Sequence, residues 1–167
     1  MFKIETVGDC YVAVTGLPEA QSSHAINMAK FAQDCVDAMG SLVADQLMTM
    51  FGGNDTARLA IRVGMHSGSV TAGVLRGEKS RFQMFGDTVN VAARMESTGV
   101  PGRIQASEDC ANELIERGFG NWTKARDEYV AVKGKGKPEE RKDVSFATRE
   151  RMCHLPHSQL RQSQDLC

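Results

Sequence analysis

Residues 80–103, SRFQMFGDTVNVAARMESTGVPGR, hold the strongest local signals for the fold. The stretch 82–85 predicts a strand, and Asp87 is typical of the N-terminus of a helix that follows directly. We expect this helix to end at about Ser97, because residues 98–102 contain the Gly and Pro residues that stop helices. A strand followed at once by a helix predicts helices packed against a sheet.

The N-terminal stretch predicts a β-hairpin followed by a long helix. Residues 2–7 and 10–14 each alternate apolar and polar side chains, and they flank a Gly-Asp turn pair at 8–9. A serine at 22 or 23 can cap a helix that runs to about Met50, with apolar side chains along one side.

The rest of the chain is expected to interleave short strands with helices. We expect a loop at 52–55 and a helix starting at about 107–109. The expected strands are 59–66, 70–75, 103–106 and 129–132. Helices between antiparallel hairpins predict an α/β or α+β sandwich. From about residue 137 the apolar periodicity fades, so we predict a poorly structured tail over 137–167.

Composition excludes several functional classes. The 167 residues suit one domain, and 20 Lys+Arg against 21 Asp+Glu give no reason to expect nucleic-acid binding. Apolar stretches are short and interrupted, so we expect no membrane contact by this segment itself. The five scattered cysteines lack CxxC spacing, which argues against a disulfide framework or zinc site and favours a reducing cytosolic setting.

Three features carry side chains suited to phosphate chemistry. Asp9 lies in the turn pair, where a carboxylate can reach a metal ion, although Gly-Asp is also an ordinary turn. Asn90 and Arg94 are four residues apart and share a helical face, where they can hold a ribose oxygen and a phosphate. Lys133 and Lys135 lie in a glycine-rich loop able to close over a polyphosphate. A solvated helix face and a charged loop are the structural alternatives.

The residues of these motifs, and the order in which they occur, resemble those of the class III adenylyl/guanylyl cyclases over residues 2–136. The matching runs are KIETVGDCY at 3–11, GLP at 16–18, HA at 24–25, RVGMHSG at 62–68, AGV at 72–74, FGDTVN at 85–90, RMESTG at 94–99, PGRI at 101–104 and VKGKG at 132–136. The resemblance implies a partial catalytic domain over residues 1–136 with a ferredoxin-like βαββαβ-type core, in which helices pack on a mainly antiparallel sheet.

The resemblance also implies roles for individual residues. Asp9 matches the second of two aspartates that hold two Mg²⁺ or Mn²⁺ ions per site. Asn90 matches the residue that orients the ribose. Arg94 matches the one that stabilises charge developing on the α-phosphate, an interaction worth most in the transition state.

Phosphate and base recognition are implied by further positions. Lys133, with Lys135 as the alternative, matches the triphosphate-binding lysine, and Arg103 aligns with a basic residue that meets the terminal phosphates. Glu5 matches the guanylyl-type base-reading residue. Gln83 matches neither the adenylyl nor the guanylyl type, and its amide can both donate and accept hydrogen bonds. These positions favour GTP over ATP.

The implied function is conversion of a nucleoside triphosphate into its 3′,5′-cyclic nucleotide and pyrophosphate. Family members act as homodimers or heterodimers that share residues across each site, often as the cytosolic part of a membrane protein. The alternative is a catalytically dead cyclase-like module that binds nucleotide or a partner chain.

One departure from the family pattern concerns the N-terminus. The family's first metal aspartate, with the first strand and helix of the sheet, lies upstream of the point where this sequence starts. One carboxylate binds a metal pair less well than two do, so we expect this fragment alone to be inactive.

Overall fold

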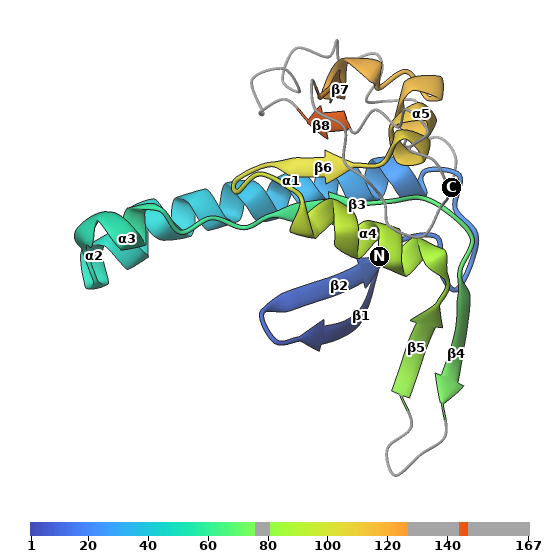
Figure 1. The fold of residues 1–167 in the computed structure, drawn as a ribbon, viewed down its shortest axis with the longest axis horizontal. Coiled ribbons are helices and arrows are strands. Elements are labelled where there is room, and N and C mark those ends of the chain that lie inside the picture. The colour runs from blue at the N-terminus through green and yellow to red at the C-terminus, as the bar shows by residue number, and fades with distance from the viewer. Residues whose placement is uncertain (76–80, 127–143, 147–167) are drawn as a thin grey trace.

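The computed structural model describes residues 1–75, 81–126 and 144–146 (Figure 1). Its strands are β1 (Phe2–Val7), β2 (Cys10–Val14), β3 (Val63–Met65), β4 (Thr71–Leu75), β5 (Arg81–Phe85), β6 (Ile104–Ala106), β7 (Thr123–Ala125) and β8 (Val144–Phe146). Its helices are α1 (His24–Leu42), the π-helical turn Val43–Leu47, α2 (Met48–Met50), α3 (Gly53–Ala57), α4 (Asp87–Ser97), α5 (Glu108–Glu116) and the 3₁₀ turn Gly120–Trp122.

The described strands form three separate sheets. β1 and β2 make an antiparallel hairpin, β4 and β5 make a second one, and the third sheet has the order β3-β6-β8-β7. β3 runs parallel to β6, whereas β8 is antiparallel to both of its neighbours. Figure 1 shows α1 along one side of β3 and β6, with the β1-β2 hairpin and the β4-β5 hairpin extending away from that sheet.

The main core lies between α1, the β3-β6 pair and α5. Small alanines on one face of α1 are buried, which allows close approach to the sheet. Ala106 and Leu114 are completely buried on the other side. Trp122 closes the core, with its ring 4.5 Å from that of Phe119.

Helix α4 packs directly on β3 through a glycine. A Cβ atom at Gly64 would clash with the backbone of Ala92 and Glu96 in α4, so only glycine permits this approach. Arg62 Nε also donates to Glu96 Oε1 at 2.8 Å, beside the same contact. The strand-to-helix stretch over residues 80–103 is therefore fixed to the parallel β3-β6 pair through α4.

Most expected elements are confirmed. Both hairpins form, α4 spans the expected 87–97, and the helix expected from Ser22 or Ser23 continues to Met50 through a π-helical turn. Every helix in 1–75, 81–126 and 144–146 is too short or too polar to cross a lipid bilayer.

Two boundaries were wrong. The loop expected at 52–55 gives way to α3, because the glycines adopt positive φ before a short helical turn. The strand expected over 59–66 is limited to Val63–Met65, the only part that pairs with β6. The strand expected at 129–132 lies outside the described residues. Within the predicted tail, Val144–Phe146 form β8, and the structure describes no other part of 137–167.

Candidate active site

The β1-β2 hairpin presents its polar side chains to solvent. Gly8 adopts a positive φ of 62°, which closes the two-residue turn and leaves Asp9 exposed at its tip. Glu5 is exposed on β1, next to a register irregularity between Lys3 and Glu5. Both of these residues are therefore exposed to solvent.

Aromatic contacts hold the hairpin against the rest of the molecule. Phe2 and Phe82 meet edge to face with ring centroids 5.5 Å apart, and Tyr11 lies 6.4 Å from Phe31 of α1. The Phe2–Phe82 contact places β1 beside β5, the two strands that hold Glu5 and Gln83. The structure thus brings together the elements of the predicted base-reading pair.

Helix α4 presents the predicted ribose and phosphate pair. Asn90 is exposed and Arg94 is half-buried one helical turn further on, so both lie on one face. Thr88 Oγ1 donates to the Ser69 carbonyl at 2.6 Å, which ties the first turn of α4 to the segment before β4. The helix that presents Asn90 and Arg94 is thus fixed at its N-terminal turn and, through Gly64, along its length.

The predicted phosphate-binding residues are only partly described. Arg103 is exposed immediately before β6, and its carbonyl accepts from Val63 N at 3.3 Å. Its backbone is thereby fixed to the sheet while its guanidinium remains on the surface. Lys133 and Lys135 lie outside the described residues.

Asp9 is the metal ligand that the sequence predicted, and it lies within the described residues. Across 1–75, 81–126 and 144–146, no three His, Cys, Asp or Glu side chains gather as a metal site. Mg²⁺ in nucleotide enzymes is held by one or two carboxylates together with substrate phosphates. The exposed carboxylate of Asp9 fits one ligand of an ion that arrives with a triphosphate.

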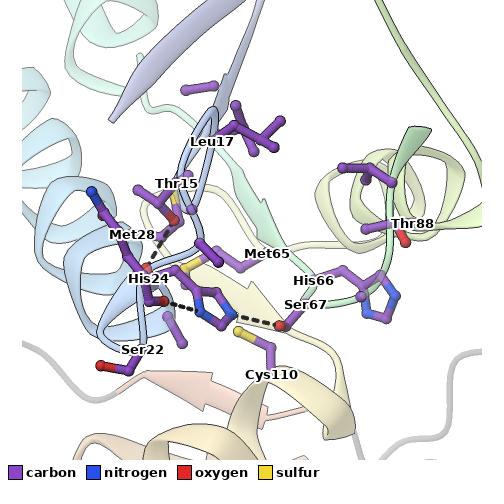
Figure 2. Close-up of a pocket in the computed structure, with 18 residues that line it drawn as sticks. Thr15, Leu17, Ser22, His24, Met28, Met65, His66, Ser67, Thr88 and Cys110 are labelled. Carbon is purple, nitrogen blue, oxygen red and sulfur yellow. Dashed lines mark hydrogen bonds between the residues drawn. The ribbon is translucent and has the colours of Figure 1, made fainter. Parts of the chain in front are cut away.

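A cavity of about 420 Å³ lies between the β1-β2 hairpin and the main sheet (Figure 2). Its walls come from β2 and the loop after it, the start of α1, and β3 with the segment after it. Side chains that sequence reasoning did not assign to any site line it, including His24 and Ser67. Their positions, 43 residues apart, give no local signal of this contact.

His24 joins three elements at the edge of this cavity. Its Nδ1 lies 2.8 Å from the Gln21 carbonyl, and its Nε2 lies 2.9 Å from both Ser67 Oγ and Glu113 Oε2. Ser67 Oγ donates to Glu113 Oε1 at 2.8 Å, so toward His24 the hydroxyl accepts. The ring thereby links the loop before α1 to the segment after β3 and to α5.

The thiol on the cavity wall is unreactive. Burial, with the nearby carboxylates of Glu113 and Asp109, raises the pKa of Cys110 to about 12. Because the thiolate is the nucleophilic form, Cys110 is not a candidate for covalent chemistry.

Comparisons with known proteins agree with the resemblance noted from the sequence. The sequence model for the adenylate and guanylate cyclase catalytic domain matches residues 1–142. A receptor-type guanylate cyclase of Caenorhabditis elegans is 40% identical over 136 residues, which are 81% of this chain and 12% of that protein. The beta-2 subunit of soluble guanylate cyclase from Rattus norvegicus is 39% identical over 82% of this chain and 18% of its own length.

A solved structure shows the same relationship in three dimensions. The guanylate cyclase domain of RhGC from Catenaria anguillulae, in complex with GTP, superposes with a TM-score of 0.68 at 35% identity. The superposition covers 89% of this chain and 72% of that domain. This chain spans only a small part of its curated relatives, but the family match extends over most of its residues. The chain belongs to the adenylate and guanylate cyclase catalytic domain family.

Proposed function

We propose that this chain forms part of a nucleotidyl cyclase site that converts GTP, in preference to ATP, into the 3′,5′-cyclic nucleotide and pyrophosphate. The observation that carries the proposal is the extent of the family match. Residues 1–142 include every predicted site position, from Glu5 to Lys135. The exposed Asp9 and the shared α4 face of Asn90 and Arg94 support it.

The proposed chemistry needs little beyond positioning and charge. Asp9 holds a Mg²⁺ or Mn²⁺ ion that lowers the charge cost of attack by the 3′-hydroxyl on the α-phosphate. Asn90 orients the ribose, and Arg94 stabilises charge that develops on the α-phosphate. Lys133, or Lys135, and Arg103 bind the remaining phosphates.

Base preference is assigned to Glu5 and Gln83. A carboxylate at position 5 accepts from guanine N1–H and the exocyclic amine, whereas adenine offers no matching pair of donors there. The named guanylate cyclase relatives support GTP. A rhodopsin-guanylyl cyclase core with converted specificity has been solved with ATPαS, so base choice on this fold can be changed.

We propose that residues from outside this segment and from a partner chain complete the site. We infer that a second carboxylate for the metal pair comes from a segment outside residues 1–167, and that the active unit is a homodimer or heterodimer. Apolar side chains exposed around the β4-β5 hairpin suit such an interface: Val74 is 61% exposed, Leu75 50% and Phe85 45%. A related cyclase domain from Blastocladiella emersonii has been solved as a non-canonical dimer and also as a monomer, so a domain of this fold can associate with a second copy.

The test is a product assay on a chimera. The part of the RhGC domain that lies upstream of the matched region is joined ahead of Met1, and the purified protein is incubated with Mn²⁺ and either GTP or ATP. We expect cGMP in excess of cAMP, and loss of both products in Asp9→Asn and Arg94→Ala variants that melt at the parental temperature. The Glu5→Lys, Gln83→Asp double variant should shift the product toward cAMP.

Two outcomes would contradict the proposal. Nucleotide binding without either product in the well-folded chimera would favour the regulatory module. An unchanged cGMP-to-cAMP ratio in the double variant would remove Glu5 and Gln83 from base recognition while leaving the cyclase assignment in place.

A further inference from the structure

A chain of hydrogen bonds joins the last turn of α4 to β6 and to the residue after β7. Thr98, the C-cap residue of α4, donates its hydroxyl to the Arg94 carbonyl at 2.7 Å, and the same hydroxyl accepts from Gln105 Nε2 at 2.9 Å. Gln105 Oε1 accepts from Arg126 Nη1 at 2.5 Å, and that Nη1 also donates to the Thr98 carbonyl at 3.3 Å. The chain of bonds therefore ends on the backbone of Arg94.

The donors and acceptors in this network fit one direction throughout. A guanidinium only donates, so the amide oxygen of Gln105 faces Arg126 and its NH₂ group faces Thr98. The hydroxyl of Thr98 accepts from that NH₂ group, which leaves its single proton for the Arg94 carbonyl. The bonds thus run in sequence from Arg126 to Arg94, an arrangement in which each bond polarises the next.

The amide at the centre of the network is buried. Gln105 is 3% exposed and lies in β6 between Ile104 and Ala106, which belong to the main core. Side chains alternate along a strand, so the Gln105 side chain is on the other face, where it reaches Met95 and Thr98 of α4. A buried amide is costly unless its polar groups are bonded, whereas an apolar side chain has no such cost. Packing alone therefore does not explain an amide at this position.

The Arg94 carbonyl is held by three donors. Thr98 N lies 3.1 Å from it and Ser97 Oγ 3.2 Å, in addition to the Thr98 hydroxyl. Arg94 lies in the last turn of α4, and helix ends fray where their carbonyls lack partners. The network restrains this turn, and with it the point from which the Arg94 side chain extends.

We propose that Thr98, Gln105 and Arg126 are positioning residues, which hold the last turn of α4 so that the Arg94 guanidinium meets the α-phosphate in one orientation. They act through Arg94 and do not contact the nucleotide. The inference rests on the proposed function, from which it takes the role of Arg94. Because Arg94 acts mainly in the transition state, its misplacement lowers kcat more than it changes KM.

A network that only stabilises the fold would behave differently. A cation near the C-terminus of a helix stabilises that helix through its dipole, and Arg126 contacts the C-cap residue of α4. Loss of that effect would lower the melting temperature and leave kcat per folded molecule unchanged. The split between kcat, KM and melting temperature therefore separates positioning from stability.

The first test measures kcat and KM for GTP with Mn²⁺ in the RhGC chimera. Thr98→Val removes the hydroxyl and keeps the shape of the side chain, whereas Thr98→Ser keeps the hydroxyl. We expect Thr98→Val to lower kcat by about tenfold and to change KM by less than about twofold. Thr98→Ser should retain the parental kcat.

A second pair of variants tests the far end of the network. Arg126→Lys keeps the charge but loses the planar group whose Nη1 reaches both Gln105 and Thr98. We expect this change to lower kcat by about fivefold. Arg117→Lys makes the same replacement at the exposed C-cap residue of α5 and should leave kcat unchanged.

Amide hydrogen exchange on the whole 167-residue chain tests the network without catalysis. The amide of residue 98 donates to the Arg94 carbonyl, so Thr98→Val should speed its exchange by about threefold to tenfold. The Arg117 amide donates to the Glu113 carbonyl at the corresponding place in α5 and serves as the control. Its exchange should be unchanged.

The outcomes bear separately on the network and on the proposed function. A kcat within about twofold of the parent in Thr98→Val, or an equal loss in Thr98→Ser, would overturn the positioning role. A lower melting temperature with unchanged kcat would also overturn it. If the parent chimera makes no cyclic nucleotide, the proposed function fails and exchange decides the network. Unchanged exchange at residue 98 in Thr98→Val would then show that the network does not restrain Arg94.

Discussion

The β1-β2 hairpin and the β3-α4-β6-α5 unit differ sharply in burial. Five of the six residues of β1 are exposed, whereas all three residues of β6 are buried. The hairpin holds Asp9 and Glu5, which are expected to contact metal and base, and the second unit holds the core. The comparison indicates that the candidate metal and base ligands lie on a lightly anchored element, while Asn90 and Arg94 lie on α4 of the unit that contains the core.

The largest expected effect is in the core of the second unit. Leu114→Ala removes a completely buried side chain and should lower the free energy of unfolding by about 2–5 kcal/mol. Val7→Ala in the hairpin, where the side chain is 60% exposed, should change it by less than about 0.5 kcal/mol. Urea denaturation monitored by circular dichroism measures both. Equal effects would show that the hairpin is as deeply integrated as the core.

A smaller effect is expected where β3 meets α4. Gly64→Ala forces a Cβ into the backbone of α4 and should destabilise the fold by about 1–3 kcal/mol. Gly73→Ala in β4 is the matched control, because no atom lies within 4 Å of the added Cβ there. Thermal unfolding distinguishes the two. Tolerance of Gly64→Ala would mean that α4 does not approach β3 as closely as the structure shows.

The smallest effect, when measured between pH 8 and 10, is a pH dependence of stability that comes from Cys110 in the core. The pKa of Cys110 is raised to about 12 from an ordinary value of 9.0, so the folded state disfavours the thiolate that the unfolded chain forms. The resulting stability is complete below pH 9 and is lost as pH rises toward 12, at about 1.4 kcal/mol per pH unit.

Comparison with a variant isolates this contribution. Between pH 8 and 10 the stability of the parent should fall more steeply than that of Cys110→Ala, as followed by urea midpoints. If the free energy of unfolding changed with pH equally in the parent and in Cys110→Ala, the Cys110 thiol would not be buried in solution.

Local patterns predicted the elements whose signals are contiguous in the sequence. Both hairpins and α4 follow from alternation, turn residues and an acidic residue in the first helical turn, because hydrogen bonds in these elements join residues close along the chain. The expected cap at Asp87 was wrong, because Gly86 is the N-cap residue and no side chain caps α4. Helix α3 was missed because Gly52 and Gly53 are typical of a loop, and their positive φ values precede a helical turn. The length of β3 is set by the three residues that pair with β6, a contact between segments that are distant along the chain.

The sequence by itself determined the family, the candidate ligands on the hairpin and the shared face of Asn90 and Arg94. These depend on residue type and on spacing within one element. Only the tertiary structure decided that His24 meets Ser67 and Glu113, that Gly64 admits α4, and that β2 and β3 border one cavity. Such contacts join residues that are distant along the chain. Chain packing brings them together, and no periodicity in the sequence records it.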